Sequence, residues 1–352
     1  MRYVDKNMKY KMLLTVTLCA VFITCLVVYP TGSSAGVIRG LKMCSSVIIP
    51  SLFPFTAVAI FIFKLGIVDR VSHFVSRPAE LIFKMNGQEL CVFIMSCIGG
   101  YPVGAQLIAN LYRENKISRS RAEKLLSCCI NSGPSYIILA VGTGILSSKD
   151  LGYLLFASSL TASVLIAIFV GFLYKNDGVV NNKLSKIKDL NISDIFVDAT
   201  YEATSSMIKI CSFIVLFSAI QGLIDEIITN KHIKSAIIFF SEITNSIISG
   251  NKNIFAISFL LGFAGLCVHL QIIAICKDLK IKYLRFLIFR ILHGTLSAVI
   301  TYLLVKLFRI TIPAISQGIS MQPTSYSVLF SVALLFCAVV FMGSVHNNLK
   351  TG

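Results

Sequence analysis

The feature that most constrains this chain is a series of apolar runs, each long enough to cross a membrane. A helix of about 20 apolar residues spans the hydrocarbon of a bilayer. Runs of that order lie near 12–29, 89–112, 125–147, 151–174, 253–276, 285–308 and 325–344. Hydrophobic residues make up 56% of the chain and charged residues only 14%, which is more apolar surface than a soluble domain could bury. The sequence therefore predicts an all-α polytopic membrane protein.

Two further apolar segments, 47–63 and 206–224, are shorter or interrupted, by Pro50 and Pro54 in the first and Lys209 in the second. At an offset of 160 residues, seven residues of the first region recur in the second: Ser45, Ser46, Ile48, Phe53, Ala59, Ile60 and Ile67 return as Ser205, Ser206, Ile208, Phe213, Ala219, Ile220 and Ile227. At an offset of 165, Gly100, Gln106, Ile108 and Ala109 return as Gly265, Gln271, Ile273 and Ala274. Apolar alphabets also produce chance matches, so the sequence predicts a duplicated architecture, with chance similarity as the alternative.

The charge balance is strongly basic, with 32 Lys and Arg against 16 Asp and Glu. In a soluble protein such a balance would suggest a nucleic acid partner. Here the excess lies in loops, which is typical of membrane topology and of attraction to anionic lipid, so we expect the lipid bilayer and no nucleic acid as a partner. Four basic residues precede the first apolar run and place the amino terminus in the cytoplasm. Residues 1–30 are predicted to form an uncleaved transmembrane anchor, with a cleaved signal peptide as the alternative.

The basic loop 113–124 indicates whether segment 47–63 crosses the membrane. If the segment crossed, this loop would lie outside, against the positive-inside rule. A re-entrant hairpin keeps it inside, together with the basic loop that follows residue 174. Each half would then contain one hairpin and three crossings, so the halves would be inverted relative to each other. We expect a first repeat at 31–175, a cytoplasmic linker at 176–195 and a second repeat at 196–352. The basic segment 277–290 would then lie outside, so the orientation of the second half stays open.

Two apolar spans contain residues that interrupt helices. Gly99-Gly100-Tyr101-Pro102-Val103-Gly104-Ala105-Gln106 lies in the middle of one span, and Asn131-Ser132-Gly133-Pro134-Ser135-Tyr136 lies in the next. Glycine permits non-helical backbone and proline removes a donor, so both spans should unwind there. Unwound backbone at membrane depth needs protein or water around it, and the helix amino termini that it creates suit a carboxylate or phosphate. The alternative is a pair of kinks that let helices approach closely.

Four motifs in order carry a resemblance to a known family: Ser-Leu-Phe-Pro-Phe at 51–55, Gly-Tyr-Pro-Val-Gly-Ala at 100–105, Asn-Ser-Gly-Pro at 131–134 and Val-His-Leu-Gln at 268–271. From about residue 30 to 345 the chain resembles the sporulation integral membrane proteins of the YlbJ (SpoVV) type, within the Gate or nucleoside-recognition group. The resemblance implies a bacterial multi-pass membrane protein made during endospore formation, in a membrane surrounding the developing spore. It also implies an architecture like that of concentrative nucleoside transporters and a role in moving dipicolinic acid. Gln106 stands where many relatives have Lys, and Ile130 where a second Asn is common.

A small aromatic dianion such as dipicolinate needs donors for two carboxylates and an apolar wall for its ring. The predicted substrate-binding residues are polar or backbone-exposing positions in the interrupted segments, together with aromatic residues for the wall: Ser51, Phe53, Gly99, Gly100, Tyr101, Gly104, Gln106, Asn131, Ser132, Gly133, Ser135, Ser205, Ser206, Lys209, His269 and Gln271. For His269 a structural role is the alternative, and for Lys209 an interfacial one. We expect Arg285 and Arg290 to be interfacial anchors, and no acidic residue to lie deep in an apolar span other than Glu89 at a span edge.

No metal site, cofactor or enzymatic activity is expected. The eleven cysteines show no C-x-x-C pattern and suit packing. No H-E-x-x-H pair occurs. The sequence therefore favours a transporter of a small organic anion. Transport of nucleosides or another anion, and a non-transporting role in spore-envelope assembly, are the alternatives. The oligomeric state, including a homo-oligomer, stays open.

Overall fold

The computed structural model describes residues 6–173, 191–248 and 253–310, and every regular element among them is helical. The predicted span 325–344 and most of the linker 176–195 lie outside the described residues. The elements are α1 (Lys6–Val28), α2 (Pro30–Met43), η1 (Cys44–Ile48), α3 (Ile49–Lys64), α4 (Ile67–Phe83), α5 (Gly87–Gly99), α6 (Tyr101–Arg113), α7 (Arg119–Cys128), η2 (Ser135–Ile145), α8 (Lys149–Leu173), α9 (Ile192–Ile227), α10 (Lys231–Ser241), α11 (Ile243–Ile248), α12 (Ile254–Phe263), α13 (Gly265–Ile275), η3 (Lys277–Leu279) and α14 (Tyr283–Phe308).

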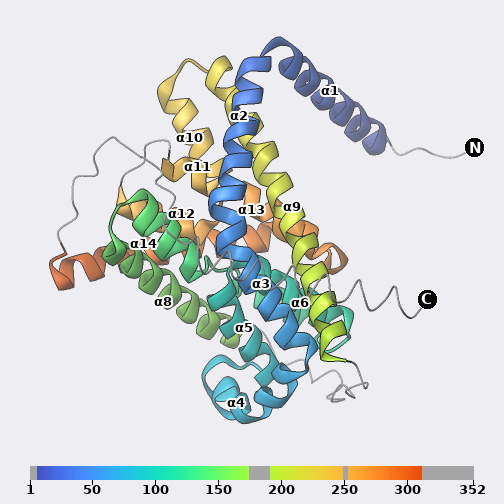
Figure 1. Cartoon of the computed structure of the whole chain (residues 1–352), viewed down its shortest axis with the longest axis vertical. Coiled ribbons are helices and arrows are strands. Elements are labelled where there is room, and N and C mark those ends of the chain that lie inside the picture. Colours follow the sequence, from blue (N-terminus) through green and yellow to red (C-terminus); the bar gives the residue numbers. More distant parts are fainter. Residues whose placement is uncertain (1–5, 174–190, 249–252, 311–352) are drawn as a thin grey trace, which may run out of the picture.

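Among the described residues, five helical segments are long and apolar enough to cross a membrane: Pro30–Lys64, Lys149–Leu173, Ile192–Ile227, Ile254–Ile275 and Tyr283–Phe308. A sixth is possible by length and composition if α4 and α5, which meet at 84°, count as one broken span. This confirms the prediction of an all-α polytopic protein. Helix α1 contains the predicted anchor as a shorter apolar segment, Met12–Val28, and it extends away from the other helices (Figure 1).

The two predicted re-entrant hairpins are wrong. Segment 47–63 lies within one continuous 35-residue helix, Pro30–Lys64, and segment 206–224 lies within the 36-residue helix α9. Pro50 does not turn the chain, because it stands in the first turn of α3, directly after the π-helical turn η1. In a regular α-helix the Pro50 ring would clash with the Ser46 carbonyl and leave that carbonyl without a hydrogen-bond partner. Ser46 lies in the wider π-helical turn, which avoids this. At 1.5 Å per residue each long helix reaches about 50 Å, well beyond a hydrocarbon core of about 30 Å.

The two long helices lie side by side and antiparallel (Figure 1). Gly36 of α2 approaches the backbone of Ser218 so closely that an added Cβ would lie 2.2 Å from the Ser218 carbonyl oxygen. At the other end of the pair, Lys64 of α3 lies 3.9 Å from Asp198. Small residues spaced four apart allow the close approach of the two helices, since without side chains the two backbones can meet.

One order of elements occurs twice along the described chain: a long helix, a shorter one, and then a span interrupted at a glycine with positive φ. In the first half these are α2–α3, α4 and the α5–α6 pair, broken at Gly100 with φ 84°. In the second half they are α9, α10 and the α12–α13 pair, broken at Ala264 and Gly265 with φ 73° and 62°; the six-residue helix α11 between α10 and α12 has no counterpart in the first half. The glycines are those that match at an offset of 165. The duplication itself and the domain boundaries stay predictions.

Candidate functional site

The first predicted break is present at Gly100. Helix α5 begins with a capping box in which Asn86 and Glu89 exchange hydrogen bonds of 2.8 Å, and it ends at Gly99. Gly100 has φ 84° and ψ −171°, a conformation that is essentially reserved for glycine. Helix α6 follows at once, with Pro102 in its first turn and no side chain capping its first N–H groups. The break therefore presents an uncapped helix amino terminus inside the protein.

The second predicted break is present between Cys128, where α7 ends, and Ser135, where η2 begins. It lies directly against the first, because a Cβ added to Gly100 would be 3.1 Å from the Gly133 nitrogen. The Ser132 hydroxyl and the Tyr101 phenol are 2.5 Å apart, and Ser132 also donates to the Leu261 carbonyl in α12 at 3.1 Å. All of these residues are at most 8% exposed. Two unwound segments, from the helix pairs α5–α6 and α7–η2, thus meet in the interior.

The third break, at Ala264 and Gly265, lies beside the junction of α10 and α11. A Cβ added to Gly265 would be 3.5 Å from the Ser241 carbonyl oxygen. The Tyr136 phenol is 2.8 Å from the Thr244 hydroxyl of α11, which ties this region to the start of η2. We call the three interruptions, Gly100–Tyr101, Asn131–Ser135 and Ala264–Gly265, the central junction.

Two ionisable residues beside the central junction were not predicted to lie there. Glu242, between α10 and α11, is 3% exposed and accepts a hydrogen bond of 3.0 Å from the Thr244 amide. Arg290 in α14 is fully buried, so the prediction that it is an interfacial anchor is wrong. Its guanidinium donates to the carbonyls of Ser127, at 2.6 Å, and Ile130, at the end of α7. No sequence signal distinguished the two residues, because Glu242 follows a short helix and Arg290 lies near a span end.

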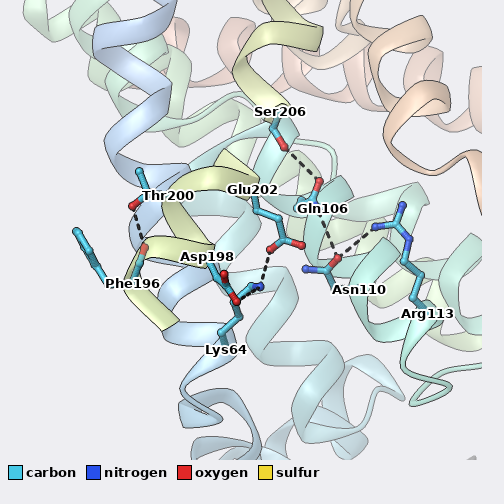
Figure 2. Close-up of polar contacts among 9 residues, drawn as sticks. All are labelled: Lys64, Gln106, Asn110, Arg113, Phe196, Asp198, Thr200, Glu202 and Ser206. Carbon is cyan, nitrogen blue, oxygen red and sulfur yellow. Dashed lines mark hydrogen bonds and ion pairs between the residues drawn. The ribbon is translucent and has the colours of Figure 1, made fainter. Parts of the chain in front are cut away.

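A column of polar side chains runs along α6 from the interior to the end of the helix (Figure 2). The Ser206 hydroxyl of α9 donates to the Gln106 amide oxygen at 3.3 Å. The Gln106 amide nitrogen in turn donates to Asn110 at 3.3 Å, and Arg113 contacts Asn110 at 3.5 Å. Beside this column, Lys64 lies 3.6 Å from the Glu202 carboxylate. The structure thus joins Gln106 and Ser206, two predicted site residues, one helix turn or more from the central junction.

The remaining predicted site residues divide into three groups. Ser51 contributes its carbonyl, which accepts from the Ser135 hydroxyl at 2.8 Å, and Phe53 packs between the two apolar clusters nearby. Asn131 donates to the Cys128 carbonyl at 3.0 Å, and its own amide oxygen has no hydrogen-bond partner. Gly99 and Gly104 allow close packing, since a Cβ at Gly104 would lie 2.1 Å from the Cys129 carbonyl oxygen.

The second group lies on α13, where side chains already have local partners. His269 is fully buried, with Nε2 2.8 Å from the Phe263 carbonyl and Nδ1 3.3 Å from the Tyr283 hydroxyl. Gln271 donates to the Cys267 sulfur at 3.2 Å. His269 therefore joins α13 to the end of α12 and the start of α14, whereas Gln271 is bonded within α13 itself.

Ser205 and Lys209 form the third group and lie on the exposed face of α9. The buried face of this helix follows Ala203, Ser206 and Ile210, at the spacing of a helix with one face turned inward. Ser205 and Lys209 fall between these positions. They therefore do not belong to the central junction, and Lys209 cannot neutralise an anion there.

Ion pairs hold the loops at the outer ends of α6 and α7. Lys116 lies 3.1 Å from Asp69 and 2.9 Å from Glu114. Burial disfavours the charged lysine, but the two carboxylates outweigh it and raise the pKa of Lys116 above its ordinary value. Glu89, predicted to lie at a span edge, is fully buried and lies 3.2 Å from Arg121 of α7. These pairs fix the ends of the helices whose other ends form the central junction.

Comparison with known proteins connects this architecture to one relative. The chain is 27% identical over 329 residues, covering 81% of each chain, to the sporulation integral membrane protein YlbJ of Bacillus subtilis (strain 168). No family model matches the chain, and no solved structure matches it. Together with the apolar helices, this similarity confirms the resemblance that the four sequence motifs indicate. The chain is a multi-pass membrane protein that is similar to the sporulation integral membrane protein YlbJ.

Proposed function

We propose that this protein carries a small organic anion across a membrane during endospore formation, and that the central junction holds the anion. One observation carries the proposal: the unwound segments of two consecutive helix pairs, at Gly100 in α5–α6 and at Asn131–Pro134 in α7–η2, lie against each other in the interior. Interrupted helices at membrane depth are the usual construction of substrate sites in secondary transporters. Simple kinks would not require two neighbouring spans to unwind at the same place.

The chemistry of the central junction suits a carboxylate. The amino terminus of α6 carries no side-chain cap, and neither does that of η2. Uncapped N–H groups and the positive end of the helix macrodipole attract anions. The Ser132 and Ser135 hydroxyls donate to the Leu261 and Ser51 carbonyls, and the Tyr101 phenol lies against Ser132, so these hydroxyls would become donors to an anion when those contacts open. The Tyr101 and Tyr136 rings supply an apolar wall. Dipicolinate, the substrate implied by the family resemblance, presents two carboxylates and a flat ring, so it is the proposed substrate.

The described conformation is closed. Residues of the central junction are buried, and Gly100 contacts Gly133 without space for a ligand between them. A ligand would therefore be admitted only when the α5–α6 pair and the α7–η2 pair move apart. Both pairs are already interrupted, so each half-helix can move without breaking a continuous hydrogen-bond ladder. We expect alternating access to use these half-helices.

The test is uptake of radiolabelled dipicolinate into proteoliposomes that contain the purified protein, with nucleosides as competitors. The diagnostic variant is Gly100→Ala, which places a side chain in a glycine-only conformation and against Gly133. Gly66→Ala is the matched control, because Gly66 also has positive φ, at 68°, but no atom lies within 4 Å of an added Cβ. Asn131→Ala removes the amide that contacts the end of α7.

We expect saturable uptake that survives in Gly66→Ala and is lost in Gly100→Ala and Asn131→Ala while all three proteins stay folded. Folding would be checked by gel filtration and by thermal unfolding. Absence of uptake by folded wild-type protein under every ion gradient would remove transport and favour an assembly role. Uptake that nucleosides displace and dipicolinate does not would change the substrate, and full uptake by Gly100→Ala would move the site elsewhere.

A further inference from the structure

Arg290 carries a buried charge that the described residues compensate only in part. Its side chain is fully buried within the apolar span α14. Its hydrogen-bond partners are the Ser127 and Ile130 carbonyls, and its guanidinium also contacts the Phe286 ring, 5.7 Å from the centroid, and His293, at 3.3 Å. No described carboxylate pairs with it. The end of a helix supplies roughly half a negative charge, so one positive charge stays largely unbalanced.

The guanidinium is also only partly bonded. Its Nε has no hydrogen-bond partner, whereas Nη2 donates to the Ser127 carbonyl at 2.6 Å. Nε and Nη2 form one edge of the planar group, and that edge is the fork that binds both oxygens of a carboxylate. A carboxylate that replaced the Ser127 carbonyl would fill the whole edge. It would also supply the charge that the carbonyls do not.

A small pocket lies between α7 and the start of α14, lined by residues next to this group. Its lining includes Ser127 and Phe286, both of which contact Arg290. Lys282 and Arg285 also line it and are exposed to solvent. Glu123, a further lining residue, contacts both Arg285 at 3.1 Å and Arg119 at 3.3 Å, so positive charge exceeds negative charge at the mouth.

We propose that Arg290 is the specificity-determining residue that selects a carboxylate over a neutral ligand of the same shape, and that the pocket between α7 and α14 is its access route. This inference rests on the proposed function and adds to it the group that recognises charge. The Ser127 and Ile130 carbonyls hold the guanidinium in place while no ligand is bound. Arrival of a carboxylate releases the end of α7, which leads directly into the Asn131–Ser135 break.

The test compares pyridine-2,6-dicarboxylate with the neutral pyridine-2,6-dicarboxamide, which has the same ring and nearly the same shape. Binding of each to the purified full-length protein would be measured by the shift in thermal unfolding, and uptake by the KM in proteoliposomes. Charge-assisted hydrogen bonds contribute about 1.5–3 kcal/mol, so Arg290→Gln should reduce the preference for the dicarboxylate about 10- to 100-fold. Arg290→Lys keeps the charge without the fork and should retain part of the preference.

A second pair of variants keeps the proposal testable if the Arg290 variants do not fold. Lys282→Gln with Arg285→Gln removes two exposed charges at the mouth, and Lys306→Gln removes one near the other end of the same helix as the control. The mouth variant should raise the KM for the dicarboxylate a few-fold, of order threefold, at low salt and have no effect near 0.5 M salt, where the Debye length falls below about 5 Å. The Lys306 variant should match wild type.

Three results would overturn the inference. Folded Arg290→Gln could retain the wild-type preference for the dicarboxylate. It could also lose both ligands equally, as expected of a residue that only clamps α7 to α14. If the Arg290 variants do not fold, the inference is overturned when the mouth variant and Lys306→Gln have the same KM for the dicarboxylate. Wild-type protein that binds the dicarboxylate selectively but does not transport it would refute transport alone, because the binding comparison stands without uptake.

Discussion

The contact between α2 and α9 offers the sharpest test of the architecture. Gly36→Ala would place a Cβ 2.2 Å from the Ser218 carbonyl oxygen and 2.9 Å from the Ala219 Cα. Carbon and oxygen atoms approach to about 3.3 Å at the closest, so the helices must separate by about 1 Å. A gap of that size forfeits a quarter to a half of the dispersion attraction along the facing surfaces. Overpacking of this kind costs about 1–3 kcal/mol.

The matched control is Gly144→Ala in η2, where an added Cβ has only the Leu139 carbonyl oxygen near it, at 3.4 Å. That distance is an ordinary contact, so we expect the stability to change by less than about 0.5 kcal/mol. Gly222→Ala tests the same interface from the other helix, because its Cβ would lie 2.0 Å from the Gly32 carbonyl oxygen. The double variant Gly36→Ala with Gly222→Ala should cost less than the sum of the two, since the first separation already makes room for the second.

The assay is thermal unfolding in detergent, followed with a thiol-reactive dye. The chain contains no Trp, whereas seven of the ten described cysteines are buried and become reactive only on unfolding. A loss of about 2 kcal/mol corresponds to a fall in melting temperature of the order of 5 °C. Gly36→Ala that unfolds at the same temperature as Gly144→Ala would show that the two long helices do not meet face to face at Gly36. The antiparallel arrangement of α2 and α9 would then be refuted.

Three further substitutions test the interior around the central junction by the same unfolding assay. Asn86→Ala removes the capping box of α5 and should lower the free energy of unfolding by about 1 kcal/mol. A decrease in melting temperature no larger than that of a substitution at an exposed position would show that the cap does not form in the protein. Glu89→Gln leaves the Arg121 charge without its partner and should cost about 3 kcal/mol, with part of the loss recovered when Arg121→Gln is added; no recovery would mean that the two side chains do not interact. Tyr101→Phe removes the hydrogen bond to Ser132 and should cost about 1 kcal/mol, and the loss should vanish in a background of Ser132→Ala.

Continuous apolar runs were predictable from the sequence because composition alone determines them. The runs predicted at 151–174, 253–276 and 285–308 correspond to Lys149–Leu173, Ile254–Ile275 and Tyr283–Phe308. The two breaks were also predictable. Gly100 adopts a conformation that other residues avoid. Pro134 disfavours helical backbone at the residue before it, so α7 could not continue through this segment.

The errors arose where the effect of a residue depends on its position in the helix or on its neighbours. Pro50 reads as an interruption, but in the first turn after a π-helical turn it is compatible with a continuous helix. Arg290 reads as an anchor at a span end, and only the position of the α7 carbonyls shows why the charge is buried. Lys209 reads as a site residue because it is a charge inside an apolar segment, although the periodicity of buried residues in α9 already assigns it to the outer face.

The two halves of the described chain differ at the element that matters most for the anion. Under the predicted duplication, the Asn131–Pro134 break matches residues 295–298 at an offset of 164, at which Lys116, Ile117 and Arg121 recur as Lys280, Ile281 and Arg285. Residues 295–298 lie inside the uninterrupted helix α14. An unbroken helix has no free amino terminus to offer an anion at that depth. What α14 offers is Arg290, one turn before those residues and held against the end of α7. We infer that the two elements divide the work: the broken α7–η2 pair supplies movement and backbone donors, and rigid α14 supplies a fixed positive charge. On this basis, the first step of an access cycle is the loss of contact between Arg290 and the α7 carbonyls, since that contact joins the moving element to the fixed one.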